Sequence, residues 1–185
     1  MRIRTVLFAL LLSCTAAAAN AQGTAQLVEH TALGGKVALM APADFSRMSP
    51  EMLRAKYPTQ RPPTEVLSNE RGTVSIAFNH TQQAMAPAQI REAHAALEGQ
   101  LKSTFPTARW NRSEVVRRGT QDVAVLDFWS PTADGEVRNI MVVSSVDGRA
   151  MIVSFNVTRE LEGEWGAVGE RIMNSIRVAG VVNPI

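Results

Sequence analysis

Alternating apolar and polar positions predict most of the strands in this chain. Between Thr73 and His80, the apolar residues Val74, Ile76 and Phe78 alternate with smaller or more polar ones. A period of two is typical of a strand that buries one face. Apolar runs that are separated by turn sequences such as Gly-Gly and Asp-Gly predict further strands. The expected strands cover residues 26–33, 36–40, 65–69, 73–80, 109–117, 122–130, 137–146 and 149–157.

The strands at 122–130, 137–146 and 149–157 differ from the others because they are apolar on both sides. Strands of this kind are usually covered on both faces of a sheet. The strand at 109–117 carries more charge. We therefore expect it at an edge of the sheet, while the order of the other strands stays open.

Helical periodicity predicts three helices. Ser49-Pro50-Glu51 is a typical helix start, with serine as the N-cap and proline in the first turn, and it predicts a short helix that stops before Pro58. A long helix is expected at 88–104 and another within 159–176. The long helix has one apolar stripe at helical spacing, made of Ile90, His94, Leu97, Leu101 and Phe105.

The order of these elements indicates the fold class. A hairpin, a helix, a second hairpin, a long helix, an antiparallel meander and a final helix follow one another along the chain. This order predicts an α+β domain, in which helices pack on a single antiparallel sheet.

This order and three local sequences resemble the PsbP-like fold family. The matching stretches are Lys36–Phe45, the amphipathic helix after Pro87, and Arg149–Phe155, which leads into the last helix. The resemblance extends from Leu33 to Val178. It implies an α/β/α sandwich and a binding, chaperone or assembly role. It supplies no general catalytic set, so no family residue is assigned here.

The first residues have the features of an export signal. Arg2 and Arg4 precede an apolar run that is too short to span a bilayer, and Ala19-Asn20-Ala21 is a cleavage site. This predicts a signal peptide at 1–21 and a single domain at 22–185. Alternatively, Leu11-Leu12-Ser13-Cys14 resembles a lipobox, which would end the signal at residue 13 and leave Cys14 lipidated. Either interpretation places the domain outside the cytoplasm, as a periplasmic or secreted protein or as a membrane-anchored lipoprotein.

Removing the predicted signal changes the charge and the cysteine content. Residues 1–21 hold two of the 19 basic residues, none of the 17 acidic residues and the only cysteine. The remaining domain therefore has no net formal charge, which gives it no electrostatic reason to bind nucleic acid or anionic lipid. A chain cut after Ala21 also lacks a thiol for a disulfide, for catalysis or for a metal site.

The histidines show no metal or catalytic spacing. His30, His80 and His94 are isolated from one another and from cysteine, and no nucleophile elbow or phosphate loop occurs. We therefore expect no metal, no cofactor and no catalytic residue, with His94 at least partly buried in the core. One alternative is a periplasmic hydrolase in which His80 or His94 works with an acid or hydroxyl partner.

A hairpin near residue 133 brings together the clearest candidate cluster. If Ser130 faces Val137, then Asp127, Trp129 and Arg138 share one face of the sheet. The guanidinium could then stack on the indole and reach the carboxylate. Two readings stay open: a charge pair that closes the rim of the core, and a contact for an anion or a peptide.

Two further surfaces carry aromatic and arginine residues, which are the usual anchors of protein interfaces. Tyr57 and Arg61 belong to a proline-rich loop, and Arg109 and Trp110 open the charged strand. Scattered exposed residues of these types are also common on surfaces without a function.

Together these observations favour a non-catalytic binding or adaptor protein that acts on an envelope or secreted protein partner, as an accessory, assembly or immunity-type factor. Two alternatives to this hypothesis are a small-ligand carrier with a pocket between sheet and helices, and the periplasmic hydrolase described above. The sequence leaves the partner and the oligomeric state open.

Overall fold

The computed structural model describes residues 26–59, 61–132 and 135–178. The three helices are α1 (Pro50–Lys56), α2 (Ile90–Thr104) and α3 (Glu162–Asn174), and a 3-10 turn, η1 (Pro87–Gln89), precedes α2. The strands are β1 (Leu27–Ala32), β2 (Val37–Pro42), β3 (Ser46–Arg47), β4 (Glu65–Ser68), β5 (Ser75–Ala84), β6 (Arg109–Arg118), β7 (Gln121–Thr132), β8 (Gly135–Val146), β9 (Arg149–Thr158) and β10 (Arg177–Val178). The predicted signal segment and Cys14 lie outside the described residues. Within those residues, no helix is both long and apolar enough to cross a membrane.

The strands form two antiparallel sheets, and the predicted α+β class is confirmed. The main sheet has the order β3-β4-β5-β9-β8-β7-β6, so the charged strand β6 lies at an edge, as expected. The difference from the expected single sheet is a second, three-stranded sheet of order β1-β2-β10. The N-terminal hairpin pairs with β10, and Val37, Leu39 and Ala41 of β2 are buried in the same core cluster as residues of α3.

Helix α3 contacts strands of both sheets and forms the main core with them. Ile172 of α3, Leu39 of β2 and Phe155 of β9 are fully buried in one cluster. The helix approaches the main sheet closely at Gly169. A Cβ atom added there would stand only 2.4 Å from the ring of Phe155. The α3 face of the main sheet is therefore closed.

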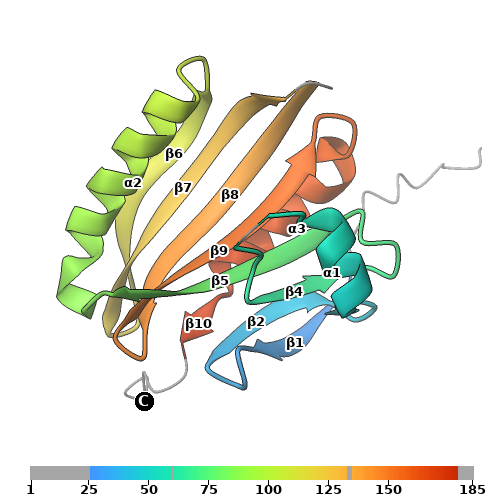
Figure 1. Ribbon diagram of the computed structural model, residues 1–185, viewed down its shortest axis with the longest axis horizontal. Helices are drawn as coiled ribbons and strands as arrows, with labels where there is room; N and C mark the ends of the chain where they lie inside the picture. Colours follow the sequence, from blue (N-terminus) through green and yellow to red (C-terminus); the bar gives the residue numbers. More distant parts are fainter. Residues whose placement is uncertain (1–25, 60, 133–134, 179–185) are drawn as a thin grey trace, which may run out of the picture.

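Helix α2 covers only part of the opposite face, along the β6 side of the sheet (Figure 1). Ile90 is its one fully buried residue, while Leu97 and Leu101 are partly buried against Leu126 of β7. The predicted apolar stripe is therefore the face that meets the sheet, but most of it lies at a margin. His94 belongs to this half-buried stripe, as expected.

The rest of this face is not covered by α2. Along β9, Ile152 and Ser154 are partly exposed, and Asn156 and Thr158 are exposed, whereas Phe155 between them is buried against α3. The expectation that the three apolar strands are covered on both faces therefore holds only beneath α2. The polar residues of the second half of β9 are the sequence signal of this uncovered region.

Helix α1 begins as the sequence predicts and leads to the uncovered region. The Ser49 hydroxyl accepts a hydrogen bond from the Met52 amide at 3.2 Å, and Pro50 opens the helix. The helix ends at Lys56, and the proline-rich loop follows. Lys56 and Tyr57 both reach Ser75 of β5, whose side chain lies on the same face as α2. Helices α1 and α2 thus lie towards opposite ends of the main sheet (Figure 1).

Candidate functional site

The β7–β8 hairpin has the register that the sequence analysis assumes. Ser130 pairs with Val137, and Trp129 pairs with Arg138. Asp127, Trp129 and Arg138 consequently share the α3 face of the main sheet, near its end. All three are only 7% exposed, so this cluster belongs to the closed side of the molecule.

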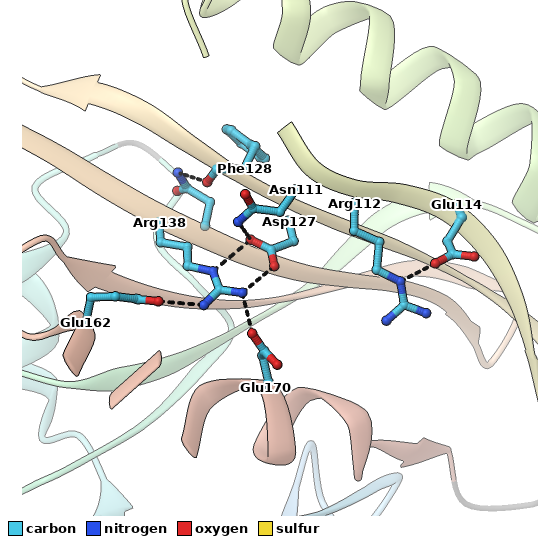
Figure 2. Close-up of polar contacts among 9 residues, drawn as sticks. Asn111, Arg112, Glu114, Asp127, Phe128, Arg138, Glu162 and Glu170 are labelled. Carbon is cyan, nitrogen blue, oxygen red and sulfur yellow. Dashed lines mark hydrogen bonds and ion pairs between the residues drawn. The ribbon is translucent and has the colours of Figure 1, made fainter. Parts of the chain in front are cut away.

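Arg138 makes ion pairs with three carboxylates (Figure 2). Its Nε and Nη2 atoms donate to the two oxygens of Asp127 at 2.9 and 2.6 Å, which is a bidentate pair. Nη1 donates to Glu162 at 2.7 Å and Nη2 also donates to Glu170 at 2.5 Å. Glu162 and Glu170 both belong to α3, so Arg138 joins this helix to β7 and β8.

The surroundings of Arg138 stabilise its charged form. Hydrogen bonding to Asp127, and then to Glu170 and Glu162, raises the pKa of Arg138 above its ordinary value, although burial opposes this rise. The guanidinium directs its hydrogen bonds at carboxylates of its own chain. The observed contacts of Arg138 form an internal clamp between β7, β8 and α3. A contact between Arg138 and an external partner stays a prediction.

Trp129 is covered by two arginines. The guanidinium of Arg159 lies 3.9 Å from its ring centroid and that of Arg109 lies 5.9 Å away. Both arginines pair with Glu136 on β8, and hydrogen bonding from Arg159, and then from Arg109, lowers the pKa of Glu136. Arg109 thus helps to close the rim over Trp129.

Trp110 lies on the other face, at the margin of α2. Its ring stacks on Phe128 with centroids 4.7 Å apart, and the Lys102 ammonium of α2 lies 5.4 Å from its centroid. Although Arg109 and Trp110 are adjacent in the sequence, the strand sends them to opposite faces. They therefore do not form one surface.

Tyr57 and Arg61 border a groove on the uncovered part of the sheet. The groove has a volume of about 530 Å³. Its floor includes Ser75 and Ala77 of β5 with Ser154 and Asn156 of β9, and the α1–β4 loop forms one wall. A second hollow of about 540 Å³ lies beside it and is also lined by Arg61 and by Asn79. Two shared residues make these hollows neighbouring parts of one open surface, which we call the open-face groove.

A row of polar side chains crosses the floor of the open-face groove. Lys56 Nζ donates to Ser75 Oγ at 3.0 Å, and the Tyr57 hydroxyl lies 3.4 Å from the same oxygen. Next to Ser75 across the sheet, Asn156 Nδ2 donates to Asn139 Oδ1 at 3.3 Å. This row offers hydroxyl and amide groups to any molecule that enters the groove.

The open-face groove carries positive charge without acidic residues. Lys56 and Arg61 line it, whereas no aspartate or glutamate among the described residues lines either hollow. Burial lowers the pKa of the Lys56 ammonium. Sequence analysis found Tyr57 and Arg61 but missed Lys56, Ser75 and Asn156. The polar positions within the apolar strand β9 were the available signal for Asn156.

The three histidines make separate contacts. His30 Nε2 lies 3.0 Å from the Pro42 carbonyl oxygen, and His80 Nε2 lies 3.0 Å from that of Val146. His94 Nε2 lies 2.9 Å from Ser113 Oγ, where α2 meets β6. Of these, only His94 has the hydroxyl partner that the hydrolase alternative requires, so Ser113 is where that alternative can be tested. Within the described residues, no cluster of histidine, aspartate or glutamate is arranged to hold a metal ion.

Comparisons with known proteins establish the fold. No protein-family profile and no curated protein matches the sequence. Cyanobacterial PsbP (CyanoP) from Synechocystis sp. PCC 6803 matches 84% of this chain and 94% of its own, with a TM-score of 0.57 at 9% identity. A Bacteroides thetaiotaomicron protein matches 83% of this chain but 48% of its own, with a TM-score of 0.50 at 12% identity. LpqN of Mycobacterium tuberculosis, described as involved in cell envelope biogenesis, matches 83% of this chain and 90% of its own, with a TM-score of 0.48 at 12% identity.

The chain therefore has a PsbP-like fold, which confirms the resemblance found in the sequence. At this level of identity, the likeness concerns the architecture alone. It names neither a partner nor an activity for this chain.

Proposed function

We propose that this protein is a non-catalytic binding factor that acts outside the cytoplasm and holds an envelope protein through the open-face groove. The observation that carries the proposal is the contrast between the two faces of the main sheet. One face is closed by α3 and by the Arg138 clamp, whereas the other leaves polar strand residues uncovered on the floor of a groove. An accessible groove on a rigid sheet is a usual place for recognition.

The sequence supports the location and the kind of partner. The export signal predicted at 1–21 directs the domain to the periplasm or the exterior, with lipidation at Cys14 as the alternative. Tyr57 and Arg61 line the groove, and aromatic and arginine side chains are enriched at protein interfaces.

Capture of the partner from the native envelope tests this proposal. The full-length chain, tagged at its C-terminus, is crosslinked in cells and purified together with bound proteins. We expect one stoichiometric protein, and the intact mass of the same sample distinguishes Gln22 from Cys14 as the first residue. Native mass spectrometry that shows a small molecule in place of a protein would support the carrier alternative and overturn the proposal.

Two size-matched variants make the capture specific to the open-face groove. Asn156→Trp places a bulky ring on the groove floor, whereas Ala95→Trp places the same ring on an exposed position of α2. We expect Asn156→Trp to lose the partner and Ala95→Trp to retain it. Equal capture by both variants and by the wild type would show that the partner binds elsewhere.

A further inference from the structure

We infer that the open-face groove binds an acidic, extended segment of the partner protein, with one of its carboxylates between Lys56 and Arg61. This inference rests on the proposed function and specifies the chemistry of the partner. It starts from Lys56, which pairs with no carboxylate among the described residues, whereas Lys36 and Lys102 each have one.

Lys56 differs from the two other lysines. Lys36 pairs with Asp147 at 2.5 Å, and Lys102 pairs with Glu98 at 2.8 Å. Among the described residues, Lys56 pairs with no carboxylate, and its ammonium donates instead to the Gly72 carbonyl and to Ser75 Oγ. Both acceptors are neutral, so its charge is not compensated within the described part of the chain.

The lost hydration of Lys56 makes an external anion favourable. Burial lowers the pKa of Lys56, because the ammonium has exchanged water for neutral protein groups. An ammonium has three donors, and two of them are used, by Gly72 and Ser75. A carboxylate that accepts the third would restore the favourable surroundings of the charge.

The rest of the groove complements a chain with acidic groups. In the part of the chain that the structure describes, no acidic residue that would repel such a segment lines either hollow. Arg61 lines both hollows and supplies a second cation, while Ser75 and Asn156 offer neutral hydrogen-bonding groups. Because the hollows share Arg61 and Asn79, they accommodate an extended segment along β5. A single small ion would occupy only a small part of this space.

Titration with a synthetic peptide tests the inference directly. The exported protein, labelled with ¹⁵N, is titrated with hexaglutamate, hexaglutamine and inorganic phosphate, and backbone amide shifts are followed. We expect saturable shifts at Ser75, Arg61 and Asn156 with hexaglutamate and none with hexaglutamine. Shifts confined to other surfaces would overturn the inference. Tighter binding of phosphate than of hexaglutamate would also overturn it, because the site would then be one for a small anion.

Three matched variants show whether Lys56 carries the recognition. Lys56→Met is expected to weaken hexaglutamate binding about tenfold, because a charge-assisted hydrogen bond to the carboxylate is lost. Lys56→Arg keeps the charge and is expected to retain binding within about threefold. Arg54→Met removes an exposed cation from the same helix, outside the groove, and is expected to change nothing. Equal weakening by Lys56→Met and Arg54→Met would mean that only general charge matters, and the inference would fail.

Capture from the envelope separates failure of the inference from failure of the proposed function. If Lys56→Met captures as much of the partner as the wild type, the proposed function stands and the acidic contact is wrong. If the wild type captures no protein although hexaglutamate binds at the groove, the site chemistry stands and the proposed function is wrong.

Discussion

Each face of the main sheet has a basic side chain close to it, and the surroundings of the two charges differ. On the α3 face, Arg138 is buried and ion-pairs with Asp127, Glu162 and Glu170, which raises its pKa. On the opposite face, Lys56 donates only to neutral oxygens, and burial lowers its pKa.

This difference distinguishes a charge that holds the fold together from a charge available to a partner. A buried charge is tolerated when carboxylates compensate it, and removing it then leaves those carboxylates unpaired. A charge that is partly desolvated without compensation does not stabilise the fold, and it can gain from an external anion. The comparison therefore predicts separate effects on stability and on binding at the two sites.

The largest effect is expected at Arg138. Arg138→Met would leave the buried Asp127 carboxylate beside Glu162 and Glu170 without a cation, and we expect a loss of about 3 kcal/mol or more in the free energy of unfolding. Denaturant unfolding followed by circular dichroism measures this loss. Arg138→Lys keeps the charge but lacks the bidentate geometry, and it serves as the control. Its free energy of unfolding is expected to lie between those of the wild type and Arg138→Met. Unchanged stability combined with lost partner capture would instead make Arg138 a binding residue.

The packing of α3 against the sheet predicts the next largest effect. Gly169→Ala would place a methyl group 2.4 Å from Phe155, and we expect a destabilisation of about 1–3 kcal/mol from overpacking. Gly99→Ala on α2 is the matched control, because nothing lies within 4 Å of its added carbon. This change is expected to stabilise the protein by up to about 1 kcal/mol through helix propensity. Similar shifts in both variants, measured by thermal unfolding, would contradict the closed-face description.

Most of the fold could be predicted from the sequence because local patterns specify it. The Ser49 cap, the Asp147-Gly148 turn and the alternation around Ile76 each define an element without knowledge of the rest. The second sheet could not be predicted in this way. Its existence depends on β2 pairing with β10, which lies more than a hundred positions later in the chain.

The sites divide along the same line. The grouping of Asp127 with Arg138 follows from the register of a single hairpin, so the sequence was sufficient to predict it. The approach of Glu162 and Glu170 depends on how α3 packs, and the open-face groove depends on where α2 stops covering the sheet. The sequence does not single out Lys56, because its neutral hydrogen-bond acceptors, Gly72 and Ser75, come from later in the chain.

A smaller effect is expected at the end of α3. Arg118 of β6 donates to the Met173 carbonyl at 2.8 Å and to Asn174 Oδ1 at 3.1 Å, which places a cation at the helix C-terminus. Arg118→Met is expected to cost about 1 kcal/mol in unfolding free energy. The neighbouring Arg117, which is exposed and pairs with Asp122, provides the control, and Arg117→Met is expected to cost clearly less. Equal losses in denaturant unfolding would show that the contact with α3 is unimportant.

The smallest effect on stability is expected at Lys56, and its dependence on pH tests the comparison most sharply. Near neutral pH, Lys56→Met is expected to change the unfolding free energy by no more than about 0.5 kcal/mol. Because the folded pKa lies below the ordinary value of 10.5, the unfolded chain binds more protons than the folded one between these two values. The stability of the wild type relative to Lys56→Met should therefore rise as the pH approaches 10.5. A relative stability that falls over this range would mean that the folded pKa is raised, as it is for a lysine that already has a carboxylate partner.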